Sequence, residues 1–331
     1  MGAQPLAVVT GAAGFIGSHM VDLLLEEGYR VHAIDNLSGG RRDNLEPHRA
    51  NARLTFEVND IRDLQSDHPL FRDATYVFHF AGIGDIVPSI ERPVDYLSTN
   101  VMGTVRVLEA ARAARVRKFV YAASSSCYGV ATELPTTEQA PLNPQYPYAL
   151  SKYLGEEAVM HWGQVYHLPV MSMRISNAYG PRSRTTGAYG AVFGVFLAQK
   201  LAGKPFTVVG DGTQQRDFIF VTDVVKAFLL AAESPQAGQI YNVGAGRPQS
   251  VNRLVELLGG DVVHIPKRPG EPDCTWADTT KIRAALGWVP QVSFEEGITR
   301  MLEHMDFWRQ APVWTPETIA GATKEWFACL K

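Results

Sequence analysis

The amino-acid sequence predicts an α/β fold, with a doubly wound parallel sheet and a smaller C-terminal lobe. Two observations predict the sheet. Short apolar segments that end in small or polar residues recur along the first half of the chain, and stretches with helical spacing separate them. Strands that alternate with helices are typical of βαβ units and of a parallel sheet covered on both faces. The expected strands cover residues 6–10, 29–35, 53–60, 74–82, 116–125 and 168–176, and helices are expected over 19–28 and 100–114.

The alternation weakens after about residue 176. Residues 203–223 have the pattern of strand, turn and strand, residues 251–260 that of a helix followed by glycines, and residues 293–308 that of a last helix. We therefore expect a first domain over residues 1–176 and a smaller lobe mainly over residues 177–331. Some later segments are expected to return to the first domain.

Composition excludes several classes of protein. The net charge of −3 gives no reason to expect nucleic acid or an anionic membrane as a partner. The chain lacks a run of about 18 apolar residues and its start lacks the pattern of a signal peptide, so we expect a cytoplasmic protein. Cys127, Cys274 and Cys329 are too scattered for a disulfide framework, and the nine histidines lack ligand spacing, so no metal is expected.

A glycine-rich turn follows the first expected strand. Gly11, Gly14 and Gly17 lie in TGAAGFIGSH, where the chain enters the first helix. Glycines allow a tight turn and close approach of the backbone, and the N-terminus of the helix presents free N–H groups to a pyrophosphate. The sequence therefore predicts a Rossmann-type domain that binds a dinucleotide.

Asp35, at the end of the second strand, indicates which dinucleotide is bound. A carboxylate there can bind both hydroxyls of the adenosine ribose and repels a 2′-phosphate, so NAD is favoured over NADP. Arg41 and Arg42 are close enough in sequence to hold that phosphate, but the position of Asp35 at the strand tip outweighs them. Asp60 and Ile61, after the third strand, are expected at the adenine ring, although Asp60 also fits a solvated acid at a strand end.

Tyr148 and Lys152 form a Y-x-x-x-K pattern at the start of an expected helix. Residues four apart share a helix face, so the lysine ammonium would stabilise the phenolate and lower the pKa of Tyr148 toward working pH. Tyr148 would then be a general base toward an alcohol. Ser124, Ser125 and Ser126 follow a strand to the same edge of the sheet, where at least one hydroxyl is expected to hold the substrate oxygen.

Seven segments occur in the order and spacing of a known family. They are TGAAGFIG, DNL at 35–37, HFAG at 79–82, SSSCYG, YPYALSK, RISNAYGPR and GDGTQQRDFIFVTD. In these segments the chain resembles the extended short-chain dehydrogenase/reductases, and within them the nucleotide-sugar epimerases and dehydratases. The resemblance covers nearly the whole chain. It implies further contacts with NAD from Phe15, Ile16, Asn36, Phe80, Ala81 and Gly82, together with Tyr148 and Lys152.

The resemblance also implies which reaction is catalysed. The active serine or threonine of the family stands four residues before the tyrosine of the YG pair, which is Ser124 before Tyr128 here. The 4,6-dehydratases have an acid pair at the next two positions and the uronic-acid decarboxylases a glutamate at the second, where this chain has Ser125 and Ser126. Cys127 lies one position away from the cysteine of the GDP-mannose 3,5-epimerases, and we interpret it as a core residue. What remains is similar to a 4-epimerase.

Such an enzyme would take the proton of the sugar 4-hydroxyl with Tyr148, aided by Lys152 and Ser124, while the 4-hydride moves to tightly bound NAD. The 4-keto sugar would turn about its diphosphate linkage and receive the hydride on its other face. The resemblance places the nucleotide sugar against the second lobe, where two arginines suit a diphosphate because their hydrogen bonds are bidentate and charge-assisted. The implied substrate-binding residues are Ser124, Ser126, Asn177, Arg216, Arg268 and Thr275.

Two local features bear on the choice of sugar. Residues 185–193, TTGAYGAVF, resemble the corresponding stretch of bacterial epimerases that act on UDP-N-acetylhexosamines. Thr275, three residues before Asp278, stands where a bulky tyrosine would restrict the pocket to plain hexoses. The hypothesis is a pocket for UDP-glucose and UDP-galactose with room for the UDP-N-acetylhexosamine pair.

Other interpretations stay open. The scaffold also serves UDP-uronate 4-epimerases, whose sugar carboxylate an arginine or threonine of the pocket could bind, and dehydratases or decarboxylases, which would here work without an acid at Ser126. A non-catalytic NAD-sensing protein often lacks the tyrosine or the lysine, whereas this chain has Tyr148, Lys152 and Ser124. A homodimer joined through a four-helix contact is implied by the resemblance alone.

Overall fold

The structure is a computed structural model that describes residues 4–183 and 192–330. Its centre is a sheet of seven strands in the order β3, β2, β1, β4, β5, β6, β11, and every neighbouring pair is parallel. The predicted α/β fold with a doubly wound parallel sheet is therefore confirmed. The strands are β1 (Leu6–Thr10), β2 (Arg30–Asp35), β3 (Leu54–Val58), β4 (Tyr76–His79), β5 (Lys118–Ser124), β6 (Val170–Ile175) and β11 (Gln239–Val243).

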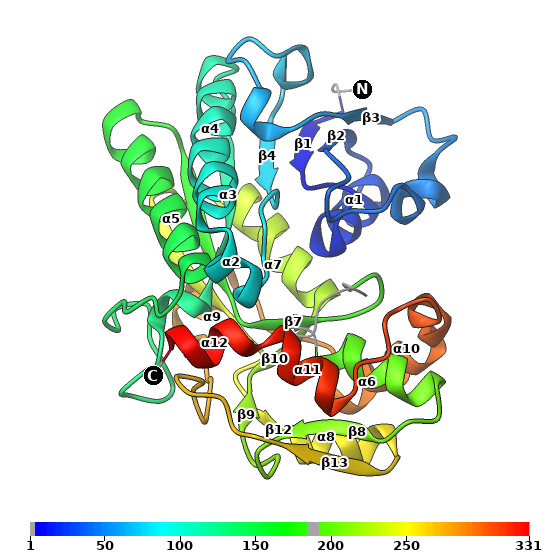
Figure 1. Cartoon of the computed structure of the whole chain (residues 1–331). Helices are drawn as coiled ribbons and strands as arrows, with labels where there is room; N and C mark the ends of the chain where they lie inside the picture. Colours follow the sequence, from blue (N-terminus) through cyan, green and yellow to red (C-terminus); the bar gives the residue numbers. More distant parts are fainter. Residues whose placement is uncertain (1–3, 184–191, 331) are drawn as a thin grey trace.

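Helices cover both faces of the sheet (Figure 1). In β1, Ala7 and Val9 share a buried core with residues of α1 and α7, whereas Val8 shares one with residues of α4 and α5. Side chains of a strand alternate between faces, so this strand is buried throughout because both of its faces are covered. The helices of this domain are α1 (Phe15–Glu26), α2 (Ile86–Glu91), α3 (Pro93–Leu97), α4 (Thr104–Ala113), α5 (Pro147–Tyr166), α7 (Val221–Glu233) and α9 (Thr280–Leu286).

The strand order reverses at β1: β2 and β3 follow on one side of it, and β4, β5 and β6 on the other. Strand β1 has β2 on one side and β4 on the other, so a crevice opens at the carboxyl ends of β1 and β4. Thr10, His79 and Ser124 stand at the carboxyl ends of β1, β4 and β5. The second lobe lies below this edge of the sheet in Figure 1. This arrangement puts the expected functional residues between the two parts.

The second lobe has its own core, in which aromatic rings of Tyr179, Phe193, Phe218 and Phe294 stack or meet edge to face. Strand β11 comes from this half of the sequence but pairs with β6 in the central sheet. The elements are β7 (Asn177–Tyr179), α6 (Val192–Leu201), β8 (Phe206–Val209), β9 (Gln215–Arg216), β10 (Phe218–Phe220), β12 (Gln249–Ser250), α8 (Val251–Leu258), β13 (Val262–Ile265), α10 (Phe294–Glu303), α11 (Pro316–Ala322) and α12 (Lys324–Cys329).

Helix boundaries differ from the predicted ones at three places. Helix α1 begins at Phe15 rather than 19, because Gly14 is its N-cap and the last motif glycine lies inside it. The predicted helix over 293–308 ends at Glu303 and is followed by a 3₁₀ turn over Met305–Trp308. Before α4, residues Ser98–Gly103 form a π-helical turn, which apolar spacing does not reveal.

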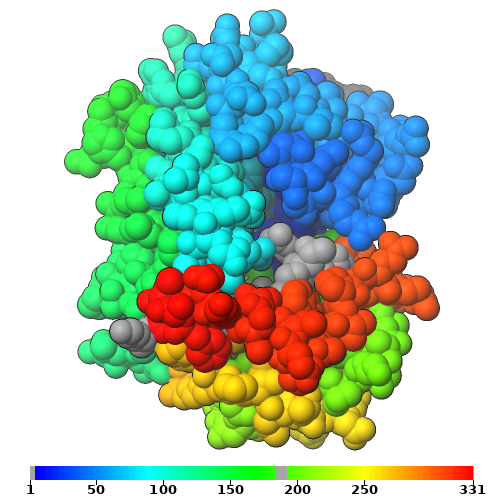
Figure 2. Space-filling model, in the orientation of Figure 1, coloured from blue at the N-terminus to red at the C-terminus, as the bar shows by residue number. Residues whose placement is uncertain are grey.

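Two further features concern the molecular surface. Within residues 4–183 and 192–330, no helix is both long and apolar enough to cross a membrane. In the space-filling view, the C-terminal residues (red) reach from the second lobe to the α2 region of the first domain (Figure 2). Helix α12 packs against α2 at that point.

Candidate active site

The glycine motif forms a turn that only small residues can occupy. Gly11 has φ +69°, and a Cβ there would lie 2.6 Å from the backbone nitrogen of Ala81. A Cβ on Gly17 would collide with the carbonyl of Gly11. Gly14 caps α1 without a side chain, so the first N–H groups of this helix face the crevice free of a side-chain cap. The geometry fits a pyrophosphate, which needs close backbone approach and N–H donors.

Asp35 lies where a carboxylate at the tip of β2 was predicted. Its Oδ2 accepts a hydrogen bond from the Ala13 backbone at 2.9 Å, and its Oδ1 accepts one from the Leu37 backbone at 2.7 Å. Burial raises its pKa, which those backbone hydrogen bonds partly offset. The guanidinium of Arg41 lies 5.0 Å from the ring centre of Phe307, and that of Arg42 lies over Phe56. Both arginines thus lie over aromatic rings. The carboxylate of Asp35 remains the group that can bind the ribose hydroxyls and repel a 2′-phosphate.

Asp60 is held by several donors at the ends of β2 and β3. It accepts a hydrogen bond from Asn36 Nδ2 at 2.8 Å and two from the Arg62 guanidinium at 2.9 and 2.8 Å. The hydrogen bond with Arg62 holds the pKa of this carboxyl well below its usual range. Asp60 therefore fixes the loop that carries the buried Ile61.

The segment after β4 forms the opposite wall of the crevice. Phe80 packs on Phe228 of α7, with ring centres 4.6 Å apart, and Ala81 lies against Gly11. A Cβ on Gly82 would lie 2.9 Å from Asn100 Oδ1 and 3.9 Å from Lys152 Nζ. The segment 80–82 thus connects the glycine turn to the predicted catalytic lysine. Phe15 and Ile16, in the first turn of α1, are partly buried at the border of the two lobes.

Tyr148 and Ser124 meet at the end of β5. The Ser124 hydroxyl acts on the Tyr148 phenol, and its Oγ lies 2.8 Å from Ser126 Oγ. Burial raises the pKa of the Tyr148 phenol, and the Ser124 hydroxyl offsets part of that rise. The sequence predicted a lowered pKa instead. The difference arises because removal of the phenolate from water outweighs the stabilisation expected from a lysine one turn away.

Lys152 lies in the interior, four residues after Tyr148 on α5. Its Nζ stands 4.5 Å from the ring centre of Tyr121, whose hydroxyl donates to the Lys152 carbonyl at 3.3 Å. Burial lowers the pKa of Lys152 to about 8, and the charge of Glu156 opposes that effect. The ammonium thus has a shifted pKa near neutral pH in a buried crevice, which is typical of functional sites.

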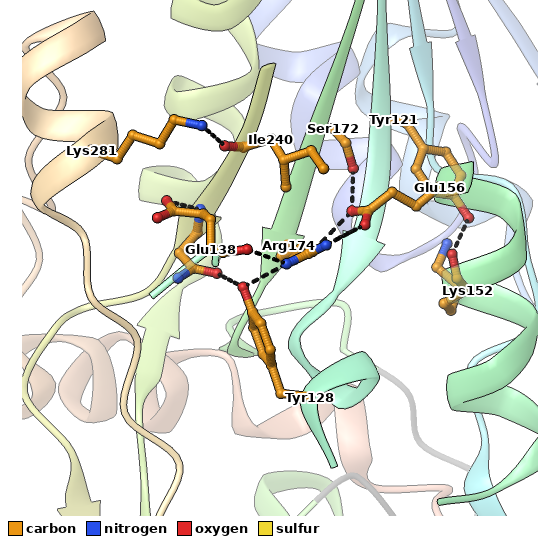
Figure 3. Close-up of polar contacts among 10 residues, drawn as sticks. Tyr121, Tyr128, Glu138, Lys152, Glu156, Ser172, Arg174, Ile240 and Lys281 are labelled. Carbon is orange, nitrogen blue, oxygen red and sulfur yellow. Dashed lines mark hydrogen bonds and ion pairs between the residues drawn. The ribbon is translucent and has the colours of Figure 1, made fainter. Parts of the chain in front are cut away.

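A buried ion pair between Glu156 of α5 and Arg174 of β6 joins α5 to the sheet (Figure 3). Arg174 Nη2 lies 2.6 Å from Glu156 Oε1, and Ser172 donates to Glu156 Oε2 at 2.7 Å. The same guanidinium donates to the hydroxyl of Tyr128 at 2.9 Å and to the carbonyl of Glu138 at 3.1 Å. One side chain therefore joins α5, β6 and the segment after Ser124. Sequence analysis did not single out Glu156 or Arg174, although Arg174 lies in RISN.

Asn100, in the π-helical turn, is another residue that sequence analysis missed. Its side chain accepts a hydrogen bond from the Ile83 backbone at 2.7 Å and donates to the Ile83 carbonyl at 2.9 Å. It also donates to Ser151 Oγ at 2.8 Å, and Ser151 donates to the carbonyl of Tyr148. This amide therefore joins the loop after β4 to the first turn of α5. No local pattern in the sequence marked it, because its partners Ile83 and Ser151 lie on other elements.

A cavity of about 360 Å³ connects this site to the second lobe. Its wall includes Ser124, Ser126 and Tyr148 from the first domain and Asn177, Arg216, Arg268 and Thr275 from the second half of the chain. The structure thus brings the predicted substrate-binding residues together with Ser124 and Tyr148, whereas Lys152 is not among the residues that line this cavity. The size is within the range of small-molecule sites. Thr275 donates to Asn177 Oδ1 at 3.0 Å, so these two residues form one patch of the wall.

Both predicted diphosphate ligands face the same carboxylate. Arg216 Nη2 lies 2.8 Å from Glu271 Oε1, and Arg268 Nη1 lies 3.7 Å from Glu271 Oε2. Sequence analysis missed Glu271, which stands three residues after Arg268. It also missed Ile319 and Trp326, which line the cavity from the C-terminal helices. Residues 185–191 of the predicted sugar-selecting segment lie outside the described residues.

Cys127 is buried at the end of β5, as interpreted from the sequence, and burial raises its pKa to about 12. A thiol in that state is a poor nucleophile. In the ranges that the structure describes, His, Cys, Asp and Glu side chains form no cluster that could hold a metal ion.

The parallel sheet, the glycine turn under Asp35, the serine at the end of β5 and the tyrosine and lysine of α5 define a short-chain dehydrogenase/reductase of the extended type. The model of the NAD dependent epimerase/dehydratase family matches residues 7–244. The chain therefore belongs to the NAD-dependent epimerase/dehydratase family, and NAD is its cofactor, as predicted. The resemblance found in the sequence is confirmed.

Known members of the family resemble the chain over most of its length. A UDP-glucose 4-epimerase of Mycolicibacterium smegmatis is 39% identical over 304 residues, which are 89% of this chain and 97% of that protein. The UDP-N-acetylglucosamine 4-epimerase of Methanobrevibacter ruminantium, in complex with UDP-N-acetylmuramic acid, has a TM-score of 0.87 at 31% identity and covers 92% of this chain and 99% of its own. The UDP-glucuronic acid 4-epimerase of Bacillus cereus, with UDP-glucuronic acid and NAD, has a TM-score of 0.84 at 30% identity, with 91% and 99% covered.

Proposed function

We propose that this protein is an NAD-dependent UDP-hexose 4-epimerase that acts through a transient 4-keto sugar. The observation that carries the proposal is the composition of the cavity wall. It combines Tyr148 and Ser124 with two arginines, and the positions after Ser124 hold Ser125 and Ser126 rather than acids. This set can exchange a proton with an alcohol and bind a diphosphate, and at those positions it lacks the carboxyl group that elimination would use.

In this proposal, Tyr148 takes the proton of the sugar 4-hydroxyl and later returns it. Ser124 shares that hydroxyl through its own hydrogen bond, and Lys152 supplies a positive charge one helical turn away. The cofactor, when bound, accepts the hydride of the sugar C4 and gives it back on the other face. Glu156 and Arg174 hold the helix that carries Tyr148 and Lys152 in register with the strand end that carries Ser124.

Arg216 and Arg268 are proposed to bind the diphosphate about which the keto sugar turns. Their shared partner Glu271 keeps both guanidinium groups near each other on the cavity wall. A diphosphate has enough oxygens to accept bidentate hydrogen bonds from both. The binding of the diphosphate fixes one end of the substrate while the sugar end stays free to turn.

The proposed sugars are UDP-glucose and UDP-galactose together with the UDP-N-acetylhexosamine pair. Thr275 is small and lies in the cavity wall, where its hydroxyl is engaged by Asn177 and by the backbone N–H of Asp217. A threonine leaves space for an N-acetyl group that a tyrosine would fill. Known relatives of this chain include epimerases named for each of these sugar types.

A UDP-uronate 4-epimerase is the second candidate, supported by the similarity to the enzyme of Bacillus cereus. Against it, the basic side chains among the described lining residues are Arg216 and Arg268, and the proposal uses both for the diphosphate. A dehydratase or decarboxylase is less well supported because Ser126 is not an acid. A non-catalytic role is opposed by the presence of Ser124, Tyr148 and Lys152 together.

The test is incubation of the purified protein with UDP-glucose, UDP-N-acetylglucosamine and UDP-glucuronate separately, with proton NMR of the anomeric region. We expect the galacto epimers of the first two to appear without added oxidant. Conversion of UDP-glucuronate alone would establish the second candidate, and conversion of UDP-glucose alone would contradict the argument from Thr275. Mass spectrometry of small molecules released from the protein would show whether NAD is tightly bound.

We also propose a homodimer. Apolar side chains are exposed on adjacent parts of α3, the π-helical turn and α5, which contact one another. A second copy could bury them as a four-helix contact, and an exposed apolar patch of this kind typically marks an interface. Light scattering should give twice the mass of the chain, and Leu154→Glu should give monomers. The exposed residues are Val94, Leu97, Met102, Leu150 and Leu154.

A further inference from the structure

We propose that Trp326 is a positioning residue that closes the sugar side of the cavity and keeps the oxidised sugar bound until it is reduced again. This inference rests on the proposed 4-epimerase function and assigns a part of that reaction to the C-terminal helices. The assignment follows from three contacts of one indole ring.

The first contact is with the first domain. After α10 the chain passes Trp308, which is buried in the core of the second lobe, and continues through α11 to α12. Helix α12 then packs against α2, so the C-terminal segment runs from one lobe to the other (Figures 1 and 2). Trp326 is 2% exposed and forms a buried cluster with Val87, Ile86, Tyr146 and Leu330. A buried tryptophan at a junction between lobes contributes a large apolar area to their association.

The second contact reaches the proposed base through one intermediate ring. The ring centres of Trp326 and Tyr146 lie 5.9 Å apart. Tyr146 in turn stacks on Tyr148, with an interplanar angle of 8° and centres 6.4 Å apart. Tyr96 meets Tyr148 edge to face from α3. Trp326 therefore supports one flank of the phenol that is proposed to carry the proton.

The third contact is with the loop that carries Arg268 and Glu271, which are proposed to lie at the diphosphate. Trp326 Nε1 donates a hydrogen bond to the carbonyl of Pro269 at 2.8 Å. Pro269 follows Arg268 directly and stands two residues before Glu271, so the indole anchors the loop that carries both. Trp326 and Ile319 also line the same cavity as Ser124 and Tyr148. One side chain thus joins the reacting end of the site to its anion-binding end.

The proposed chemistry needs such a closure. Oxidation moves a hydride from the sugar C4 to NAD and the hydroxyl proton to Tyr148, which leaves a neutral 4-keto sugar. Reduction must follow on the same enzyme, because the two electrons are held by the bound dinucleotide. If the keto sugar leaves first, the enzyme retains a reduced dinucleotide and cannot complete the cycle. By holding both the loop that carries Arg268 and the flank of Tyr148, the indole of Trp326 favours rotation of the bound keto sugar over its release.

Two variants test the proposal in the full-length protein. Trp326→Leu keeps an apolar side chain in the cluster but removes the indole and its hydrogen bond. We expect it to raise the KM for the UDP sugar about tenfold and to accumulate reduced dinucleotide during turnover, measured by absorbance and fluorescence. The filtrate should contain a UDP sugar lighter by two hydrogens. Trp326→Phe keeps a ring and loses only the bond to Pro269, so its KM should rise about threefold with little accumulation.

Phe327→Ala is the matched control, because Phe327 is the next residue of α12 and is 45% exposed. It should leave KM and dinucleotide oxidation unchanged. Thermal unfolding shows whether each variant is folded. The dissociation constant of UDP, measured by calorimetry, shows separately whether the loop that carries Arg268 still binds the diphosphate. If a variant only lost folded protein, its total turnover rate would fall, but the amount of reduced dinucleotide per folded molecule would not rise.

The inference is overturned if Trp326→Leu has the KM of the wild type and no accumulation of reduced dinucleotide. It is also overturned if Trp326→Phe is as impaired as Trp326→Leu in accumulation, since closure by the ring would then be irrelevant. Failure of the proposed function gives a different result, because the wild-type protein would then interconvert neither UDP-glucose nor the N-acetylhexosamine sugars.

Discussion

Glu156 and Arg174 form an ion pair of 2.6 Å in the interior, where their side chains are 1% and 3% exposed. Glu156 lies one helical turn after Lys152 and Arg174 lies on β6, so the pair fixes α5, the helix that carries Tyr148 and Lys152, to the sheet. The hydrogen bonds from Arg174 to Tyr128 and Glu138 extend the contact to the loop after Ser124. Three elements that meet the substrate cavity therefore share one buried charge pair.

Substitution Glu156→Gln should strongly destabilise the protein, by about 3–5 kcal/mol in the free energy of unfolding, because it leaves the Arg174 guanidinium buried without its counterion. Urea unfolding followed by circular dichroism measures this. Glu46→Gln is the control, since Glu46 pairs with Arg49 at a surface where the side chains are 56% and 80% exposed. Its cost should stay below about 1 kcal/mol. Equal costs for the two variants would refute a structural role for the buried pair.

Removal of the Tyr148 hydroxyl should abolish most proton transfer. Tyr148→Phe is expected to lower kcat about 10²- to 10⁴-fold, which is the usual contribution of general acid–base catalysis. The dissociation constant of UDP should change little, because the arginines that are proposed to bind the diphosphate lie in the other half of the cavity. Tyr153→Phe, on the same helix, should retain wild-type kcat. Full activity of Tyr148→Phe would show that another group carries the proton.

The rate should rise with pH through about 8. Burial lowers the pKa of Lys152 to about 8 and raises that of Tyr148, so both groups hold their protons at pH 7. In the proposed reaction Tyr148 acts as a base only after the site has lost one proton, and we expect that loss to be shared between Tyr148 and Lys152, since they lie one helical turn apart. We expect kcat/KM to increase about tenfold per pH unit below that value and then to level off. Lys152→Met should move the rise to higher pH, and an unchanged profile in that variant would contradict the coupling.

The size of residue 275 should decide the range of sugars. Thr275→Tyr is expected to lower kcat/KM for UDP-N-acetylglucosamine at least tenfold while it retains activity with UDP-glucose, because overpacking excludes the larger substituent. Thr275→Ser, which keeps the hydroxyl bonded to Asn177, is the matched control and should accept both sugars. Parallel losses for both sugars in the tyrosine variant would indicate damage to the wall rather than selection.

His79 should make stability depend on pH. Its Nδ1 lies 2.6 Å from Thr10 Oγ1 and its Nε2 lies 2.9 Å from Thr104 Oγ1, in the interior beneath Lys152. Burial lowers the pKa of His79 to about 3 from an ordinary value of 6.5. Between pH 6.5 and 3, His79 is therefore protonated in the unfolded state but neutral in the folded state. The free energy of unfolding falls as the pH falls through this range.

Between pH 6.5 and 5 this histidine alone should remove about 2 kcal/mol from the free energy of unfolding. Urea unfolding at both pH values, compared with His79→Gln, measures its share, and the variant should show a smaller loss. His161→Gln, at an exposed position of α5, should behave as the wild type. An equal loss in His79→Gln would assign the pH dependence to other groups.

The sequence by itself determined the fold and the candidate residues at the carboxyl edge of the sheet. Regular alternation of buried strands and helices permits few arrangements other than a parallel sheet, so the positions of β1 to β6 followed from apolar spacing. The glycine motif, Asp35 and the pair Tyr148 and Lys152 were recognisable because each depends on local geometry. A turn, a strand tip or one helical turn brings such groups together without any long-range contact.

Only the tertiary structure decided which distant residues complete the site. Asn100 and Trp326 carry no local pattern, because their partners lie on other elements. Glu271 has one local partner, Arg268, but its other partner, Arg216, lies 55 residues earlier in the sequence. The ion pair of Glu156 and Arg174 joins residues 18 apart in sequence, and it is visible only once α5 packs on β6. The direction of the pKa shift of Tyr148 was likewise decided by the tertiary structure. Spacing reveals a neighbouring charge, but burial depends on everything that packs around the phenol, and burial prevails here.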